Sequence, residues 1–471
     1  MKRSAHRIFG IPLPFRCIAA WWGTVVMLGA VEPAQQTSYY RDIQPVFEKS
    51  CTGCHHPGKR KGGLDLTTFE ALAKGGENGA VSYPGQPERS SLLEQVSGDK
   101  PAMPKKGDPL STVEVERIRR WISEGAVDDT PEAARHFQPG PPDVYEFKPV
   151  IQAQAYSPNG RFLAVAGYYE ILLHDLEGGG PMQRLVGGSP RIEKLEFSPN
   201  GTWLAACGGA PTQYGELQIW SLPEASLHHT IRIGDDSLFG LAFSPDNNRV
   251  AVGGTDRKIH VIEVETGGEL RSFGNHIDWI FAVSFSREGG SILSAGNDET
   301  IKLTDAETGR YIDDVNQSVG KIRALLIHPN KDLVLLGDDT GLLRSYKIGP
   351  RVFAADDVNR NRDVNRVKEF ERQPKAVTVL ACNTNGTQFA AGTIAGEARV
   401  YDEEGHRLAL INPKSGPVFS VAFRPGHDEI SVGGFDGVLR VYHPKTGELI
   451  REWVPFPIAI TTLQDRPLTL P

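Results

Sequence analysis

The feature that most constrains the fold of this 471-residue chain is a turn that recurs at nearly constant spacing. Each copy follows an apolar segment and precedes further segments in which apolar and polar residues alternate. The turns begin at Ser157, Ser198, Ser244, Ser286, His328, Asn383 and Arg424, at intervals of 41, 46, 42, 42, 55 and 41 residues. This period, with strand-like alternation, is typical of β-propeller blades. The sequence therefore predicts an all-β, seven-bladed propeller over residues 144–456.

One interval is longer than the others, and its excess lies near residues 351–372, where charges of both signs are mixed. Most insertions of this kind are solvated loops, and a contact with a partner protein is the alternative. Closure of the propeller is expected to need a strand from one chain end that completes the blade of the other end. Residues 144–149 and 449–454 are both apolar enough to contribute it.

The repeats resemble the WD40 family over residues 150–456. The Trp-Asp pair that ends each repeat in that family is degenerate here, and Tyr401-Asp402 is one of its nearest copies. The resemblance implies a structural hydrogen-bond network of His276, Ser294 and Asp298, so His276 is interpreted as structural rather than catalytic. It also implies a rigid face on which other proteins dock.

The strongest chemical signal is the segment Cys51-Thr52-Gly53-Cys54-His55. Two thiols at this spacing can add to the two vinyl groups of one haem, and the adjacent imidazole can then reach the iron. A zinc site would need a fourth ligand that this segment lacks. A thioredoxin-like redox pair would need a surrounding βαβ pattern. The segment predicts one covalent haem c, attached at Cys51 and Cys54, with His55 as the proximal iron ligand.

The distal iron ligand is inferred by elimination among the four methionines, at positions 1, 27, 103 and 182. Met1 and Met27 belong to the N-terminal segment, and Met182 belongs to the repeats. Met103 lies between Pro101 and Pro104, which restrict the backbone around it. Met103 is therefore the expected distal ligand, and an open or His-bound iron is the alternative.

Helical patterns flank this motif. Four apolar residues precede it at helical spacing: Tyr40, Ile43, Val46 and Phe47. Ser111 and Glu114 predict a capping box that opens a second helix. The apolar stripe of that helix is Val115, Ile118, Trp121 and Ile122, and Gly125 is a natural stop. We expect a small all-α haem domain over residues 38–128.

Four segments together resemble the planctomycete-type cytochrome c domain. They are residues 40–47, the Cys-x-x-Cys-His motif, residues 103–107 (Met-Pro-Lys-Lys-Gly) and residues 120–126 (Arg-Trp-Ile-Ser-Glu-Gly-Ala). Lys105 stands where that family has a second proline, which loosens the loop slightly. The resemblance implies haem c with His55 and Met103 as iron ligands.

The N-terminus has the pattern of a secretory signal peptide over residues 1–30. Four cations without an acid precede an apolar run of about 15 residues, which is short for a membrane span. We expect export, for example to the periplasm, with no membrane span after cleavage; an uncleaved N-terminal anchor is the alternative. A proline-rich linker is expected at residues 129–143 and a C-terminal tail at residues 457–471.

Composition and charge narrow the function classes. The formal charge of −7 argues against nucleic-acid binding, which needs clustered Lys and Arg. Hydrophobic residues at 39% and charged residues at 23% are typical of globular domains. Cys207 and Cys382 lie in different repeats and are interpreted as two buried thiols rather than a bridge.

These features predict a single-haem electron carrier that serves redox partner proteins and uses its propeller to dock proteins. The alternative is a periplasmic haem-dependent oxidoreductase in which the propeller forms part of a substrate or second-cofactor site. Whether the chain is an enzyme is left open by the sequence.

Overall fold

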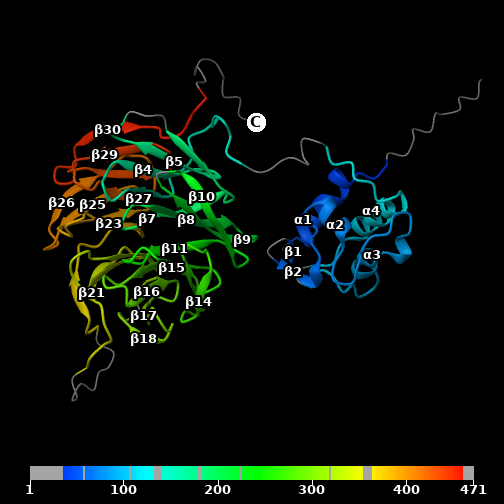
Figure 1. Cartoon of the computed structure of the whole chain (residues 1–471), viewed down its shortest axis with the longest axis horizontal. Coiled ribbons are helices and arrows are strands. Elements are labelled where there is room, and N and C mark those ends of the chain that lie inside the picture. Colours follow the sequence, from blue (N-terminus) through cyan, green and yellow to red (C-terminus); the bar gives the residue numbers. More distant parts are fainter. Residues whose placement is uncertain are drawn as a thin grey trace, which may run out of the picture.

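The computed structural model describes residues 36–52, 54–56, 59–105, 108–131, 140–178, 182–222, 224–317, 320–353 and 363–459. Figure 1 shows a region of short helices followed along the chain by a ring of strands. The expected signal peptide, most of the linker and most of the C-terminal tail lie outside the described residues. Among the described helices, none is long and apolar enough to cross a membrane.

The N-terminal region consists of short helices and one very short ribbon. Its helical elements are η1 (Tyr39–Ile43), α1 (Gln44–Ser50), η2 (Lys61–Gly63), α2 (Phe69–Lys74), η3 (Pro87–Arg89), α3 (Ser91–Val96) and α4 (Thr112–Ser123). The ribbon pairs β1 (His55–His56) with β2 (Lys59–Arg60). The expectation of helices is confirmed, but the ribbon means that the region is not purely helical.

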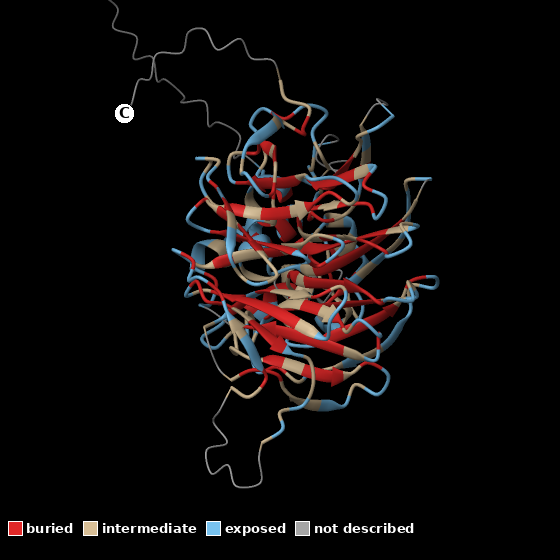
Figure 2. Ribbon diagram, turned by 90° about the vertical axis from the view of Figure 1, so that its left-hand side faces the viewer, coloured by how far each residue is buried: buried red, intermediate tan, exposed pale blue. Residues whose placement is uncertain are grey.

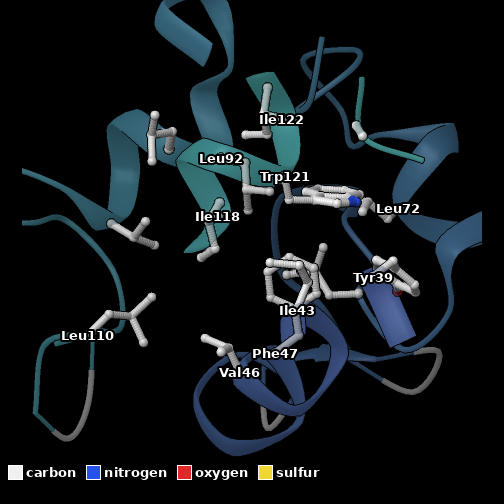
Figure 3. Packing of buried hydrophobic residues seen from close by; sticks show 14 residues of the cluster. Tyr39, Ile43, Val46, Phe47, Leu72, Leu92, Leu110, Ile118, Trp121 and Ile122 are labelled. Atoms are coloured by element: carbon white, nitrogen blue, oxygen red, sulfur yellow. The ribbon is translucent and has the colours of Figure 1, made fainter. Parts of the chain in front are cut away.

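These helices surround a single apolar cluster, whose side chains point toward one another in Figure 3. Ile43, Phe47, Ile118 and Ile122 are completely buried in it. The prediction that Tyr40 belongs to this stripe is wrong: Tyr40 is exposed, and Tyr39 is buried instead. The cause is the π-helical turn η1, whose wider spacing shifts the residue that faces the core.

The last helix of the region begins and ends where the sequence indicates. The Ser111 side chain accepts from the Glu114 N–H, and the Glu114 carboxylate accepts from the Ser111 N–H, which completes the predicted capping box. Gly125 follows the helix with a φ of 103°, a conformation that favours glycine.

The C-terminal region is a seven-bladed β-propeller, as predicted from the repeats. Each blade is an antiparallel sheet of four strands that follow one another in the chain. Blades 1 and 2 contain β3 (Gln154–Tyr156), β4 (Phe162–Ala166), β5 (Glu170–Asp175), β6 (Gln183–Val186), β7 (Arg191–Phe197), β8 (Trp203–Ala210), β9 (Tyr214–Ser221) and β10 (Ser226–Ile233). Blades 3 and 4 contain β11 (Leu238–Phe243), β12 (Arg249–Gly254), β13 (Ile259–Glu263), β14 (Glu269–Phe273), β15 (Ile280–Phe285), β16 (Ser291–Gly296), β17 (Ile301–Asp305) and β18 (Tyr311–Asp314).

The remaining blades follow the same order. Blade 5 contains β19 (Ile322–Ile327), β20 (Leu333–Asp338), β21 (Leu343–Lys347) and β22 (Arg366–Glu369). Blades 6 and 7 contain β23 (Val377–Cys382), β24 (Gln388–Thr393), β25 (Ala398–Asp402), β26 (Arg407–Ile411), β27 (Val418–Phe423), β28 (Ile430–Gly434), β29 (Leu439–Tyr442) and β30 (Leu449–Trp453). Part of the long interval after β21 is therefore strand β22, and residues 354–362 of that interval lie outside the described residues.

Buried apolar clusters fill the spaces between neighbouring blades, which Figure 2 shows as buried strands edged by exposed loops. The predicted turns connect the first and second strands of their blades; the Gly160 N–H, for example, donates to the Ser157 carbonyl at 2.8 Å.

Because each first strand begins at the same end of the ring, the loops that precede these strands share one face. The loops between second and third strands share that face too. We call it the entry face.

The ring closes differently from the prediction. Blade 1 and blade 7 each consist of their own consecutive strands, so the expected exchange of a strand between them is wrong. Instead, Tyr145 and Ile458 form a short parallel bridge, and the Tyr145 N–H donates to the Pro457 carbonyl at 2.7 Å. Tyr145 and Phe456 also pack into the cluster between these two blades. Side-chain packing and one β-bridge therefore join the two ends of the propeller, in place of the expected shared blade.

Candidate functional site

The Cys-x-x-Cys-His motif forms one tight turn that continues α1. The Cys51 N–H donates to the Phe47 carbonyl at 2.8 Å. The N–H groups of Cys54 and His55 both donate to the Cys51 carbonyl, at 3.0 and 3.1 Å. The helix end thus brings both thiols and the imidazole onto the same short segment, as the spacing predicts.

The polar groups of this segment are partly withdrawn from water. Burial, and next the neighbouring Cys54, raise the pKa of the Cys51 thiol to about 11. The Nδ1 atom of His55 is buried and has no hydrogen-bond partner in the described part of the chain. The Tyr39 hydroxyl is in the same situation, and burial raises its pKa.

Met103 lies on the same apolar cluster as the motif. Its N–H donates to the Gln95 carbonyl at 2.8 Å, which ties the loop to the end of α3. Both Met103 and Cys51 are partly buried against the cluster of α1, α3 and α4. The fold therefore brings the predicted distal ligand and one of the two predicted attachment cysteines to a common apolar core.

The donors present fit a haem c. Two free thiols share one turn, the imidazole has an uncommitted ring nitrogen, and a thioether borders the same apolar cluster. This is the set that covalent attachment and His/Met ligation need. A separate cleft of about 420 Å³ lies between the chain near Gln36 and α4, and none of these four residues lines it.

The predicted network of blade 4 is present. His276 Nδ1 lies 2.9 Å from both carboxylate oxygens of Asp298, and its Nε2 lies 2.8 Å from Ser294 Oγ. The His276 side chain is fully buried. Both ring nitrogens of His276 are thus engaged in hydrogen bonds within the blade, as the interpretation of His276 as a structural residue requires.

The other two cysteines in the described part of the chain are free: Cys207 is buried in β8 and Cys382 is half-buried in β23. Burial raises the pKa of Cys382 to about 12 and raises that of Cys207 as well. Among the described residues, no group of three or more His, Cys, Asp or Glu side chains could hold a metal ion.

A ring of bulged residues at the entry face was not predicted from the sequence. In six blades the pairing of the first two strands shifts register at the second or third residue of the first strand. These residues are Glu193, Phe239, Phe281, Arg323, Thr378 and Phe419. A bulge redirects a side chain and is common near functional sites. Alternation of apolar residues does not reveal it, although alignment of the repeats places all six at one position.

Two family models match the chain. The one described as Planctomycete cytochrome C matches residues 51–107, which include Cys51, Cys54, His55 and Met103. The one described as Nucleolar protein 10-like, N-terminal domain, a β-propeller, matches residues 190–461, more than half of the chain. The chain belongs to the Nucleolar protein 10-like propeller family. The match to this Nucleolar protein 10-like domain begins after blade 1.

Curated relatives share shorter segments with this member of the Nucleolar protein 10-like propeller family. A stretch of 74 residues is 34% identical to the F-box-like/WD repeat-containing protein TBL1X of Homo sapiens, covering 16% of this chain and 13% of that protein. The protein of the same name from Macaca fascicularis matches equally. A stretch of 133 residues is 28% identical to an uncharacterised WD repeat-containing protein of Synechocystis, covering 28% of this chain and 37% of that protein. The chain spans well under two thirds of each relative.

Proposed function

We propose that the chain is an exported electron carrier with one covalent haem c, and that its propeller docks partner proteins. The observation that carries the proposal is the turn Cys51–His55 lying against the same apolar cluster as Met103. The match of residues 51–107 to Planctomycete cytochrome C supports it.

In this proposal, Cys51 and Cys54 hold the haem through thioether bonds, and His55 and Met103 ligate its iron. A haem held in this way supplies reversible one-electron oxidation and reduction. The chain fixes the ligands: the Cys51 carbonyl anchors the turn that carries His55, and the Gln95 carbonyl anchors the loop that carries Met103. The apolar cluster around them limits access of water and so favours the less charged iron state.

The docking role rests on the propeller. A seven-bladed ring of packed sheets is a rigid scaffold with loops on both faces. The similarity to WD repeat proteins supports an assignment as a protein-interaction module. In this proposal, the redox partner is one of the proteins that dock on the propeller.

The proposal is tested on the full-length chain produced in a host that exports and attaches c-type haem. We expect one haem per chain by the pyridine haemochrome assay, haem that stays with the polypeptide on a denaturing gel, and a reversible one-electron redox titration. Cell fractionation should place the protein outside the cytoplasm. Haem that is released by acidic acetone, or a second chromophore in the spectrum, would contradict the proposal and favour an oxidoreductase.

A further inference from the structure

We propose that the entry face of blades 3–5 binds an acidic peptide segment of a partner protein through an aromatic wall and Arg323. This inference rests on the docking role proposed above, and it names the face and the chemistry of the ligand. The wall consists of Phe239, Trp279 and Phe281, which come from blades 3 and 4.

The three rings form one continuous surface. The ring centroids of Phe239 and Phe281 lie 5.5 Å apart, and that of Trp279 lies 6.3 Å from Phe239 and 6.5 Å from Phe281. Trp279 remains 45% exposed and the neighbouring Ile277 83% exposed. Apolar side chains gathered and left in water at one place mark an interaction site more often than scattered ones do.

The loop that carries Trp279 is held in place. The Asp278 carboxylate accepts from the Trp279 N–H at 2.7 Å and from Asn297 Nδ2 at 2.9 Å. One residue earlier, the Ile277 N–H donates to Asp298, which is itself fixed by His276. A wall that is already ordered loses little conformational entropy when a peptide binds.

Positive charge borders this wall. The Arg323 guanidinium lies 4.1 Å from the centre of the Phe281 ring. In the described part of the chain, no carboxylate lies within ion-pair distance of Arg323. The positive charges of Lys321 and Arg257 help to lower the pKa of Asp278, so they lie close to the Trp279 loop.

Two acids near this wall hold loops through hydrogen bonds. Asp236 accepts from the N–H groups of Thr212 and Ser237, and Asp278 accepts from Trp279 and Asn297. These carboxylates keep their negative charge, but loop hydrogen bonds occupy their oxygens, whereas Arg323 is a cation beside the apolar wall with no carboxylate partner among the described residues. A peptide with an aromatic or large aliphatic residue next to Asp or Glu matches both features. Trp and Arg are also the residue types that most often dominate binding energy.

The test is selection of a displayed random-peptide library on the immobilised full-length protein. We expect enriched sequences in which Asp or Glu flanks an aromatic or large aliphatic residue. Synthetic copies should bind in a fluorescence anisotropy assay. Arg323→Glu and Trp279→Ala should each weaken binding by roughly tenfold or more, as loss of a central contact does.

Matched controls lie elsewhere on the propeller. Lys445→Glu reverses an exposed charge in the β29–β30 loop, on the opposite face, and Tyr311→Ala removes an exposed ring on β18; both should bind as the wild type does. Arg323→Gln and the thermal melts of all variants separate lost charge from lost folding.

Enriched peptides that are basic, no enrichment at all, or equal binding by Arg323→Glu would overturn the inference. A normal haem titration in those cases leaves the carrier function standing, whereas missing haem defeats that function whatever the peptides do.

Discussion

The four proposed haem residues differ in how the chain holds them. Cys51, Cys54 and His55 share one turn closed by the Cys51 carbonyl, so their mutual placement follows from local hydrogen bonds. Met103 is distant in sequence and depends on the packing of its loop against α3. The motif could therefore be identified from spacing alone, whereas Met103 required elimination among four methionines.

Replacing the distal ligand should change the iron's coordination without releasing the haem. We expect Met103→Ala to give a high-spin ferric spectrum and ready binding of cyanide or carbon monoxide, because the sixth position is then open. Met103→His should restore six ligands and lower the potential, because a thioether favours ferrous iron more than an imidazole does. A wild type that is already high-spin would show that Met103 is not a ligand.

Replacing one attachment cysteine separates the two regions of the chain. In Cys54→Ala we expect one thioether bond at most and a lower melting temperature for the haem region. The propeller transition should stay in place, because its apolar clusters lie between its own blades. Differential scanning calorimetry and mass spectrometry of the haem peptide measure both effects. Cys207→Ala, in the propeller, is the matched control and should leave haem attachment unchanged.

At the scale of elements, patterns that depend on local hydrogen bonds could be predicted and irregular backbone could not. The α4 capping box and the repeated turns follow from short-range donors and acceptors, and the structure confirms them. The exchange of Tyr40 for Tyr39 follows from a π-helical turn, which apolar spacing does not indicate. The ring of bulged residues escaped prediction for the same reason, since one extra residue reverses the face of every side chain near it.

Two titratable groups of the first two blades should give the propeller opposite pH dependences. Burial lowers the pKa of His174 on β5 to about 4, and burial raises that of Glu196 on β7 to about 7. Between pH 4 and 6.5 the unfolded chain protonates His174 and the folded chain does not, so this contribution to stability is lost as pH falls. Between pH 4.5 and 7 the folded chain keeps a proton on Glu196, so that contribution is lost as pH rises.

Single variants should separate these contributions. As the pH rises from 5 to 6.5, the wild type gains stability from His174, and His174→Gln lacks this gain. The free energy of unfolding of His174→Gln should therefore drop, relative to that of the wild type, by about 2 kcal/mol over this range. Glu196→Gln lacks the loss that Glu196 causes in the wild type, so its free energy of unfolding should increase, relative to that of the wild type, by a similar amount. Urea unfolding at the two pH values measures both slopes. Identical slopes in the wild type and both variants would show that neither group titrates as described.

At the scale of the whole molecule, charge is unevenly distributed. Residues 38–128 contain 13 Lys and Arg and 13 Asp and Glu, whereas residues 144–456 contain 32 and 40. The acidity of the chain therefore belongs to the propeller and not to the haem region. Net charge alone could not reveal this, and it also concealed the cationic border of the aromatic wall around Arg323.

The manner of closure could not be predicted, because the repeats specify seven blades without specifying how the ends meet. Here Tyr145 connects the ends: its hydroxyl donates to the buried Glu170 at 2.6 Å, and its ring packs 5.4 Å from that of Phe456. Glu170 is also paired with Arg184, which donates to the carbonyls of Pro142 and Asp143. The start and the end of the propeller are thus joined by a small group of contacts outside the strands.

Removing the C-terminal part of these contacts should lower the stability of the propeller. A chain that ends at Pro455 loses the buried Phe456 ring and the bridge to Ile458, so its propeller should be less stable by about 3 kcal/mol or more. A chain that ends at Ala459 keeps both the Phe456 ring and the bridge to Ile458 and is the matched control. Urea unfolding followed by far-ultraviolet circular dichroism measures the difference, and hydrogen exchange should show faster opening of blades 1 and 7 than of blade 4. Equal stability of the two truncated chains would mean that packing between blades 1 and 7 closes the propeller without the help of the chain end.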